Sequence, residues 1–176
     1  MGRPGDPSNG FQFVPIRSLA ERHHPRMVAH LLALEESDRY LRFGYHATDE
    51  QVRNYVEYID FELDEVFGIF NRRHDLIALA HLACEPATAN ASNRSAEFGV
   101  SVASYARGRG YGARLFEHAV LRGRERGVET LVIHALSENA GMLAIVRHAG
   151  AAIEQAGADA EARLRLPPED VAVRLS

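Results

Sequence analysis

The residues with the clearest chemical potential are three glycines at alternate positions and the arginines beside them, namely Arg107, Gly108, Arg109, Gly110 and Gly112. They follow an apolar run typical of a strand and precede a segment with helical periodicity. Because glycine has no Cβ, backbone N–H groups at the start of that helix can approach a bound anion closely. The helix N-terminus adds partial positive charge, and the arginines add full charges. The pattern therefore predicts a phosphate site and favours a pyrophosphate.

Two common phosphate loops do not fit these residues. A dinucleotide fingerprint needs G-x-G-x-x-G after the first strand of a βαβ unit, and a Walker A loop needs Gly-Lys-Ser/Thr. The pattern Arg107-x-x-Gly110-x-Gly112 instead resembles the acetyl-coenzyme A binding motif of the GNAT superfamily of N-acetyltransferases. A plain glycine-rich turn is the alternative. The resemblance covers most of the chain, from Phe11 to about Leu166.

The resemblance implies how acetyl-CoA would bind. The main chain of seven residues would hold the pyrophosphate: Arg107, Gly108, Arg109, Gly110, Tyr111, Gly112 and Ala113. The strand before them would splay from the next parallel strand, and the pantetheine arm would pair with its backbone as an added strand does. The pairing residues would be Val100, Ser101 and Val102. The two valines equally suit the core, and both roles can hold, since side chains and backbone face different ways.

Asn139 lies between a predicted strand and a predicted helix, and it resembles the asparagine with which the family contacts its cofactor. A simple helix N-cap is the alternative, because asparagine is among the best residues there. Many members of the family place a tyrosine seven residues later as general acid for the leaving thiolate, whereas this chain has Val146. The motif therefore assigns no general acid.

A second resemblance narrows the family. The segments Ala96–Val100, Asn139–Met142 and Arg39–Phe43 are similar to the catalytic domain of bacterial protein lysine acetyltransferases. In those enzymes the glutamate that matches Glu97 is the general base. Such a base is needed because an ammonium group cannot attack a thioester until it loses a proton. We expect Glu97 to be buried beside its apolar neighbours or to act through a water, and the alternative is a strand residue on the solvated face.

Length and composition are those of a soluble globular protein, with 176 residues, 46% hydrophobic, 25% charged and a net charge of −4. We expect a single acetyltransferase domain over residues 11–176, after a flexible lead-in over 1–10 that lacks the apolar core of a signal peptide. The charge argues against a nucleic-acid or anionic-membrane face, and no apolar run approaches the roughly 18 residues of a membrane span. The single cysteine, Cys84, is expected to be buried and fits a reducing cytoplasm. Nine scattered histidines show no zinc-site spacing.

The order of predicted elements sets the fold class. Strands are predicted at Phe11–Arg17, Val66–Asn71, Leu76–Cys84, Ser95–Val102, Thr130–Leu136, Ala151–Gln155, Ala162–Leu166 and, as a short edge, Val171–Leu175. Helices are predicted at 25–34, 48–59, Ala113–Arg126 and Ala140–His148, with a connection over 35–45. From their loop positions, Arg39–Tyr45 and Glu85–Arg94 are the candidate acceptor-lining segments. Thr48 and Gln51 would cap the second helix, whose inward face would be Val52, Tyr55, Val56 and Ile59. The result is an α/β (α+β) fold: a GNAT-like mixed, mostly antiparallel central sheet of six to seven strands, flanked by about four helices, with one splayed parallel pair.

The sequence therefore predicts an acetyl-CoA-dependent N-acetyltransferase that acts on a primary amine, with no metal and no nucleic-acid or membrane partner. A protein lysine and a small-molecule amine both remain open as the acceptor, and a homodimer is compatible with the sequence. A non-catalytic acyl-CoA-binding or regulatory module on the same fold is the alternative, and Val146 favours it. Glu97 and the intact glycine motif favour catalysis.

Overall fold

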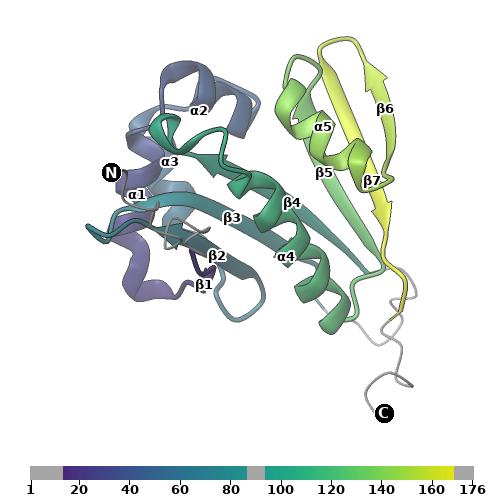
Figure 1. Cartoon of the computed structure of the whole chain (residues 1–176), viewed down its shortest axis with the longest axis horizontal. Coiled ribbons are helices and arrows are strands. Elements are labelled where there is room, and N and C mark those ends of the chain that lie inside the picture. The colour runs from purple at the N-terminus through teal and green to yellow at the C-terminus, as the bar shows by residue number, and fades with distance from the viewer. Residues whose placement is uncertain (1–13, 87–93, 169–176) are drawn as a thin grey trace, which may run out of the picture.

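The computed structural model describes residues 14–86 and 94–168, and in these residues the central feature is one seven-stranded mixed sheet (Figure 1). The strands stand in the order β1-β2-β3-β4-β5-β7-β6. Their bounds are β1 (Arg17–Ser18), β2 (Glu65–Phe70), β3 (Leu76–Cys84), β4 (Ser95–Val102), β5 (Thr130–Leu136), β6 (Ala152–Ala156) and β7 (Asp159–Arg165). Every neighbouring pair is antiparallel except β4–β5, which is parallel. The predicted mixed, mostly antiparallel sheet is confirmed.

Helices cover both faces of the sheet (Figure 1). In the described part of the chain they are α1 (His24–Leu32), α2 (Glu36–Phe43), α3 (Asp49–Glu57), α4 (Tyr111–Glu125) and α5 (Ala140–His148), with short 3₁₀ turns at Glu21–His23 and Ser104–Ala106. One apolar cluster packs α1 and α3 on the sheet through Met27 and Val52. A second cluster packs α4 and α5 on the sheet through Leu115 and Leu143. Because side chains alternate along each strand, one sheet supplies both cores.

The parallel strands β4 and β5 stay paired over only part of their length. The pairs are Ser95–Thr130, Ala96–Leu131 and Glu97–Val132, and beyond them the two strands diverge (Figure 1). On its other side β4 remains paired with β3 as far as Val102. The backbone that follows Glu97 therefore has a strand partner on one side only. The predicted splay is confirmed, and it leaves a strand edge that suits an extended ligand.

The connection predicted after the first helix is wrong, because most of it forms the helix α2, Glu36–Phe43. Its apolar residues are only Tyr40, Leu41 and Phe43, too short a stretch for hydrophobic periodicity to separate a helix from a connection. Gly44 ends the helix in the left-handed conformation, at φ +78°. Arg39 fixes the helix by donating to the carbonyl of Leu32 at 3.1 Å and to Asp49 Oδ1 at 2.7 Å.

The helix α3 is capped as predicted. Thr48 Oγ1 accepts the N–H of Gln51 at 3.2 Å, and Gln51 Oε1 accepts the N–H of Thr48 at 2.9 Å. Val52 and Val56 enter the core, whereas Tyr55 reaches the cavity described below. The capping box therefore sets the helical register that aims Tyr55.

Four predicted strands shift without changing the topology, β2 and β6 by one residue each and the first and last described strands by more. The first strand shortens to Arg17–Ser18, and residues 11–13 lie outside the described residues, as does the short edge predicted at Val171–Leu175. The last described strand begins at Asp159 instead of Ala162. It forms a tight hairpin with β6, in which Gly157 has φ +64°.

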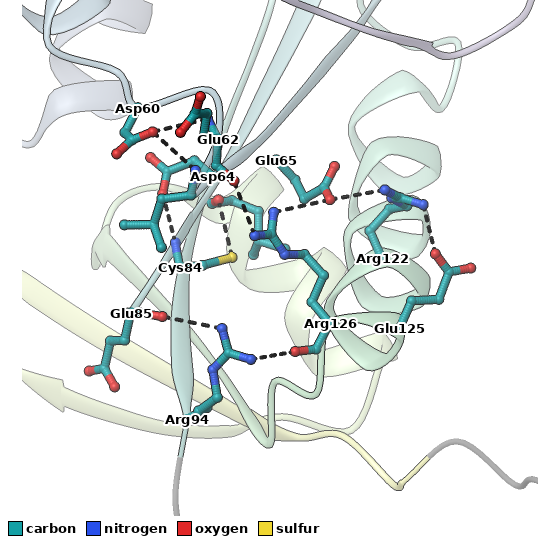
Figure 2. A network of polar contacts seen from close by, with 12 residues as sticks. Asp60, Glu62, Asp64, Glu65, Cys84, Glu85, Arg94, Arg122, Glu125 and Arg126 are labelled. Atoms are coloured by element: carbon teal, nitrogen blue, oxygen red, sulfur yellow. Dashed lines mark hydrogen bonds and ion pairs between the residues drawn. The ribbon is translucent and has the colours of Figure 1, made fainter. Parts of the chain in front are cut away.

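A polar network fastens the C-terminal end of α4 to the sheet (Figure 2). Glu65 at the start of β2 accepts from Arg122 at 2.9 Å and from Arg126 at 3.2 Å. Beside it, Asp64 Oδ1 accepts the backbone N–H of Cys84 at 3.0 Å. Cys84 is buried, as predicted, and burial raises the pKa of its thiol. The network holds β2, β3 and α4 together beside the paired end of β4.

Candidate active site

A cavity of about 440 Å³ lies where β4 and β5 separate. Its walls come from the end of α2, from β3, β4 and β5, and from the start of α5. Three of the predicted site residues line it: Glu97, Val100 and Asn139. Leu41–Gly44, from one of the two segments predicted to line the acceptor site, also contributes, and residues 87–93 of the other segment lie outside the described residues. A ligand between the strands and a group entering past α2 would meet in this cavity.

Glu97 stands where the strands part. It is the last residue of β4 that pairs with β5, and it lies opposite Ala83 of β3. Its side chain is exposed, so the expected burial beside apolar neighbours is wrong. Strand alternation is the reason, because Phe98 points into the core under α4 and Glu97 points to the opposite face. The carboxylate therefore lines the cavity in reach of solvent and of an incoming amine.

The glycine-rich segment opens α4 as predicted. Gly108 and Gly110 have φ of +76° and +77°, a conformation that residues with side chains rarely adopt. Gly110 is the N-cap residue, and no side chain caps the helix there. The first backbone N–H groups of the helix, at Tyr111, Gly112 and Ala113, have no carbonyl one turn earlier to bind. They lie at the positive end of the helix dipole, where the predicted anion site requires free N–H groups.

The charged side chains of this segment have protein partners. Arg107 forms an ion pair with Asp38 of α2, and Arg109 donates to the carbonyl of Tyr105 at 3.5 Å. Both arginines are exposed, and exposed pairs of this kind are weak enough to exchange for a phosphate. Tyr111 packs its ring into the core, so only its backbone faces a ligand.

The three residues predicted to pair with pantetheine differ in their side chains. Val100 and Val102 pack against the core under α4. Ser101 is buried, and its Oγ lies 2.8 Å from His30 Nε2. His30 Nδ1 lies 2.9 Å from the carbonyl of Leu76, and burial lowers the pKa of His30 to about 4, so the ring is neutral. The Ser101 hydroxyl is thus bound to the interior, and its backbone is the part left for a ligand.

Asn139 fills one of the two roles considered for it, the N-cap of α5, and it also faces the cavity. Its Oδ1 accepts the N–H of Met142 at 3.1 Å and caps α5, and the residue also lines the cavity. The cap uses the amide oxygen and leaves the NH₂ group able to donate to a ligand. Val146, seven residues later, is fully buried and offers no polar group.

Sequence reasoning missed a hydrogen-bonded chain on the cavity wall. Tyr55 Oη lies 2.5 Å from His81 Nδ1, and His81 Nε2 lies 2.7 Å from Asp64 Oδ2. Arg42 donates to Tyr55 Oη at 2.8 Å. Burial, the largest influence, raises the pKa of Tyr55 against the opposing charge of Arg42, so the phenol is neutral. One signal was present in the sequence, since His81 is a polar residue inside the apolar run that forms β3.

Arg42 lies directly over Gly99. A Cβ added to Gly99 would lie 2.6 Å from Arg42 Cζ, so the glycine makes room for the guanidinium. The guanidinium carbon is also 5.2 Å from the ring centre of Phe43 and 5.3 Å from that of Tyr55. A cation is therefore placed in the cavity two residues along β4 from Glu97.

The cavity thus combines a carboxylate, a phenol and imidazoles, which are groups suited to proton transfer, with a guanidinium that supplies a fixed positive charge. Within residues 14–86 and 94–168, no group of three or more His, Cys, Asp or Glu side chains is placed to hold a metal ion. In the same residues no helix is both long and apolar enough to cross a bilayer.

Comparison with known proteins decides the family. The family model of the acetyltransferase (GNAT) domain matches residues 14–152, which is most of the chain. The chain belongs to the GNAT family. The protein is therefore an acyl-CoA-dependent N-acetyltransferase, as its glycine motif predicted, rather than a non-catalytic module. No curated protein matches the sequence.

Solved GNAT structures share the fold at low sequence identity. The GNAT domain of S. lividans PAT, a protein acetyltransferase, has a TM-score of 0.72 at 22% identity and covers 86% of this chain and 89% of that one. The ribosomal-protein-alanine N-acetyltransferase from Brucella melitensis has a TM-score of 0.63 at 20% identity, and the match covers 87% of this chain and 100% of that one. The protein yncA from Salmonella typhimurium, solved with its cofactor acetyl-CoA, has a TM-score of 0.64 at 15% identity, and the match covers 90% of this chain and 96% of that one. The likeness to PAT agrees with the predicted resemblance to protein lysine acetyltransferases.

Proposed function

We propose that this GNAT enzyme transfers an acetyl group from acetyl-CoA to a primary amine by direct attack, with Glu97 as the general base. The position of Glu97 carries the proposal. Its exposed carboxylate lies at the last paired residue before β4 and β5 separate, in a cavity of about 440 Å³. A thioester held between the strands would meet an entering amine at this carboxylate.

Acetyl-CoA fits the residues around the splay. Its pyrophosphate would bind the backbone N–H groups of Tyr111, Gly112 and Ala113, beside Gly108 and Gly110. No atom lies within 4 Å of the place where a Cβ on either of these two glycines would stand, so the approach is open. The charges of Arg107 and Arg109 would add to the helix dipole. The pantetheine arm would run along the free edge of β4 at Val100, Ser101 and Val102, with the Asn139 NH₂ group donating from the other side.

The chemical step follows from this placement. Glu97 takes a proton from the acceptor ammonium, directly or through a water. The freed amine attacks the thioester carbon, the C–N bond forms, the C–S bond breaks, and coenzyme A leaves as the thiolate. Backbone N–H groups on the free edge of β4 would stabilise the negative charge on the carbonyl oxygen. Holding the two reactants in place supplies much of the acceleration.

The acceptor is a primary amine, either a protein lysine or a small molecule. The structural relatives differ in their named acceptors, which include a ribosomal-protein alanine and phosphinothricin. The fold hosts several acceptors, so it does not choose between them. The lone cysteine is buried and fits the reducing cytoplasm, where we place the protein.

Thiol release from acetyl-CoA tests the proposal directly. The acceptors would be Nα-acetyl-lysinamide, a peptide that begins with alanine, and benzylamine. Glu97→Gln should lower kcat by about 10²–10⁴-fold, the usual worth of a general base, with an unchanged Kd for coenzyme A. Glu117→Gln, which changes an exposed glutamate on α4, is the matched control and should keep the wild-type rate. Wild-type turnover by Glu97→Gln would remove Glu97 from the role, and no release with any of these amines would contradict the function.

A further inference from the structure

Polar side chains from four parts of the chain converge beside Glu97: Arg42 at the end of α2, Tyr55 on α3, Asp64 before β2 and His81 on β3. We propose that Tyr55, backed by His81 and Asp64, is a second proton acceptor in acetyl transfer. It takes the proton that the acceptor nitrogen loses after Glu97 has taken the first. The inference rests on the proposed function and adds a group that the glycine and asparagine motifs do not contain.

The reaction itself asks for two proton acceptors. A protonated primary amine ends as an amide with one N–H, so its nitrogen gives up two protons. The first leaves before the attack, and the second leaves once the C–N bond has formed and the nitrogen again carries positive charge. One proton equivalent is taken up by the thiolate when the C–S bond breaks, and the other goes to solvent. While Glu97 still holds the first proton, a second acceptor beside the nitrogen can receive the other and pass it on to the thiolate or to solvent.

The donors and acceptors of this hydrogen-bonded chain fix the direction of each hydrogen bond in it. Arginine only donates, so Arg42 gives an N–H to Tyr55 Oη at 2.8 Å. The carboxylate of Asp64 only accepts, so His81 carries its proton on Nε2 and donates it to Asp64 Oδ2 at 2.7 Å. His81 Nδ1 is then an acceptor, and it receives the Tyr55 hydroxyl proton across 2.5 Å. The order carboxylate, imidazole, hydroxyl is the one used to activate hydroxyl groups in acid–base catalysis.

The same chain allows proton transfer without forming a buried tyrosinate. The acceptor nitrogen gives its proton to Tyr55 Oη while the hydroxyl proton of Tyr55 moves to His81 Nδ1. The product is an imidazolium held between a phenol and the Asp64 carboxylate, and it returns its proton through Tyr55 afterwards. Burial raises the pKa of Tyr55 and disfavours the tyrosinate, so a coupled transfer is the route that the environment permits.

The two proton acceptors lie on the same face of the sheet. His81 is the cross-strand partner of Gly99, and Glu97 lies two residues earlier on β4, which is roughly 7 Å along the strand. The negative charge of Glu97 acts on Tyr55, as do the charges of Arg42 and Asp64. His134 and Asp159 line the same cavity from the β5 and β7 side. An amine bound between Glu97 and Tyr55 would have an acceptor on either side.

Substitutions that remove single polar atoms from the hydrogen-bonded chain test the role proposed for Tyr55. Tyr55→Phe should lower kcat by about 10²-fold, the lower end for an acid–base group, with an unchanged KM for acetyl-CoA. Tyr58→Phe, at the exposed C-cap position that ends α3, removes the same atom outside the cavity and should keep the wild-type rate. Because the residues act as one unit, the Tyr55→Phe/Asp64→Asn double variant should be no slower than the slower single variant. As pH rises, hydroxide should restore part of the lost rate.

Asp64→Asn gives a readout that does not depend on turnover. The N–H of Cys84 still needs an oxygen, so the new amide would turn its NH₂ group toward His81 (Figure 2). The ring proton should then move from Nε2 to Nδ1, which makes His81 a donor to Tyr55 instead of an acceptor. Nitrogen NMR of the labelled ring should show Nε2 protonated in the wild type and Nδ1 protonated in the variant.

The results distinguish a failure of this proposal from a failure of the proposed acetyl transfer. A wild-type protein that releases no thiol overturns both. If the wild type is active and both Tyr55→Phe and Asp64→Asn keep the rate of Tyr58→Phe, the role of Tyr55 is overturned and the proposed function stands. A wild-type His81 protonated on Nδ1 would overturn the same role. Additive losses that follow lowered melting temperatures would show a structural network and would also overturn it. Non-additive losses in kcat, with the predicted exchange of ring protonation, support it.

Discussion

Gly68 on β2 and Gly99 on β4, the two strands that flank β3, give a sharp test. Alanine at Gly68 should lower stability, whereas alanine at Gly99 should lower activity. The three atoms nearest to a Cβ at Gly99 would all belong to the guanidinium of Arg42, with Cζ at 2.6 Å. A Cβ at Gly68 on β2 would lie 2.5 Å from the backbone oxygen of Ala78 and 2.7 Å from Leu76 Cδ1. The first obstacle is the far end of a flexible side chain, whereas the second includes the main chain of the neighbouring strand.

Gly68→Ala should therefore lower stability. Overpacking costs about 1–3 kcal/mol, and a contact with backbone belongs at the upper end. Replacing a strand glycine returns about 0.5–1 kcal/mol of conformational entropy. The net loss is about 2 kcal/mol, which for a chain of this length corresponds to a fall in Tm of about 4–8 °C. The rate per folded molecule should stay close to that of the wild type.

Gly99→Ala should instead lower activity. Arg42 can swing toward solvent, so the change in Tm should stay within about 3 °C. The displaced guanidinium no longer donates to Tyr55 Oη, and its charge moves away from its place on the cavity wall. A loss of about 1.4 kcal/mol in transition-state stabilisation, at the low end for a charged hydrogen bond, is tenfold in kcat/KM for the amine.

Thermal unfolding and thiol release on both variants would decide the matter. The reasoning is refuted if Gly68→Ala melts with the wild type, because the short distance to Ala78 would then carry no cost. It is equally refuted if Gly99→Ala turns over at the wild-type rate, because the position of Arg42 would then not matter to the acceptor.

Two further predictions concern the buried histidine and the cofactor site. Burial lowers the pKa of His30 from 6.5 to about 4, so its contribution to stability is complete above pH 6.5 and is lost as the pH falls toward 4. The full loss is about 3 kcal/mol, of which about 2 kcal/mol is expected by pH 5. Urea unfolding at pH 7.5 and pH 5 should show this loss in the wild type and not in His30→Gln, and equal losses would contradict this origin. Gly112→Asp places a carboxylate against the pyrophosphate, and calorimetry should show a Kd for coenzyme A raised at least about tenfold. Its added Cβ would lie 3.3 Å from Ile145 Cδ1, so the fold should tolerate it, and an unchanged Kd would contradict the site.

The sheet and the position of the glycine motif were predictable from the sequence because their signals are local. Apolar runs bounded by turns located β2 to β5, and Gly110 marked the start of α4. The helix α2 was missed because it is short, is held by Arg39 and ended by Gly44, and has only three apolar residues to reveal it. Periodicity detects burial, and α2 is fixed mainly by polar contacts.

The polar wall of the candidate site was not predictable for a related reason. Tyr55 occupies an inward position of α3, and a helical pattern cannot separate a core ring from one that ends at a cavity. His81 and Asp64 are 17 residues apart and meet only because β2 and β3 fold back on each other. Glu97 was placed on the right strand, but its exposure depends on where β4 and β5 part, which no local pattern encodes.

The most direct test of the central claim is a titration of isotope-labelled protein with coenzyme A, followed by amide NMR. We predict that the largest shifts will fall on the amides of Tyr111, Gly112 and Ala113 and on those of β4 beyond Glu97. These are the groups that open α4 and the strand edge that β5 leaves free. Shifts confined to other parts of the chain, or no shifts at millimolar ligand, would contradict the binding mode and the acetyl transfer built on it.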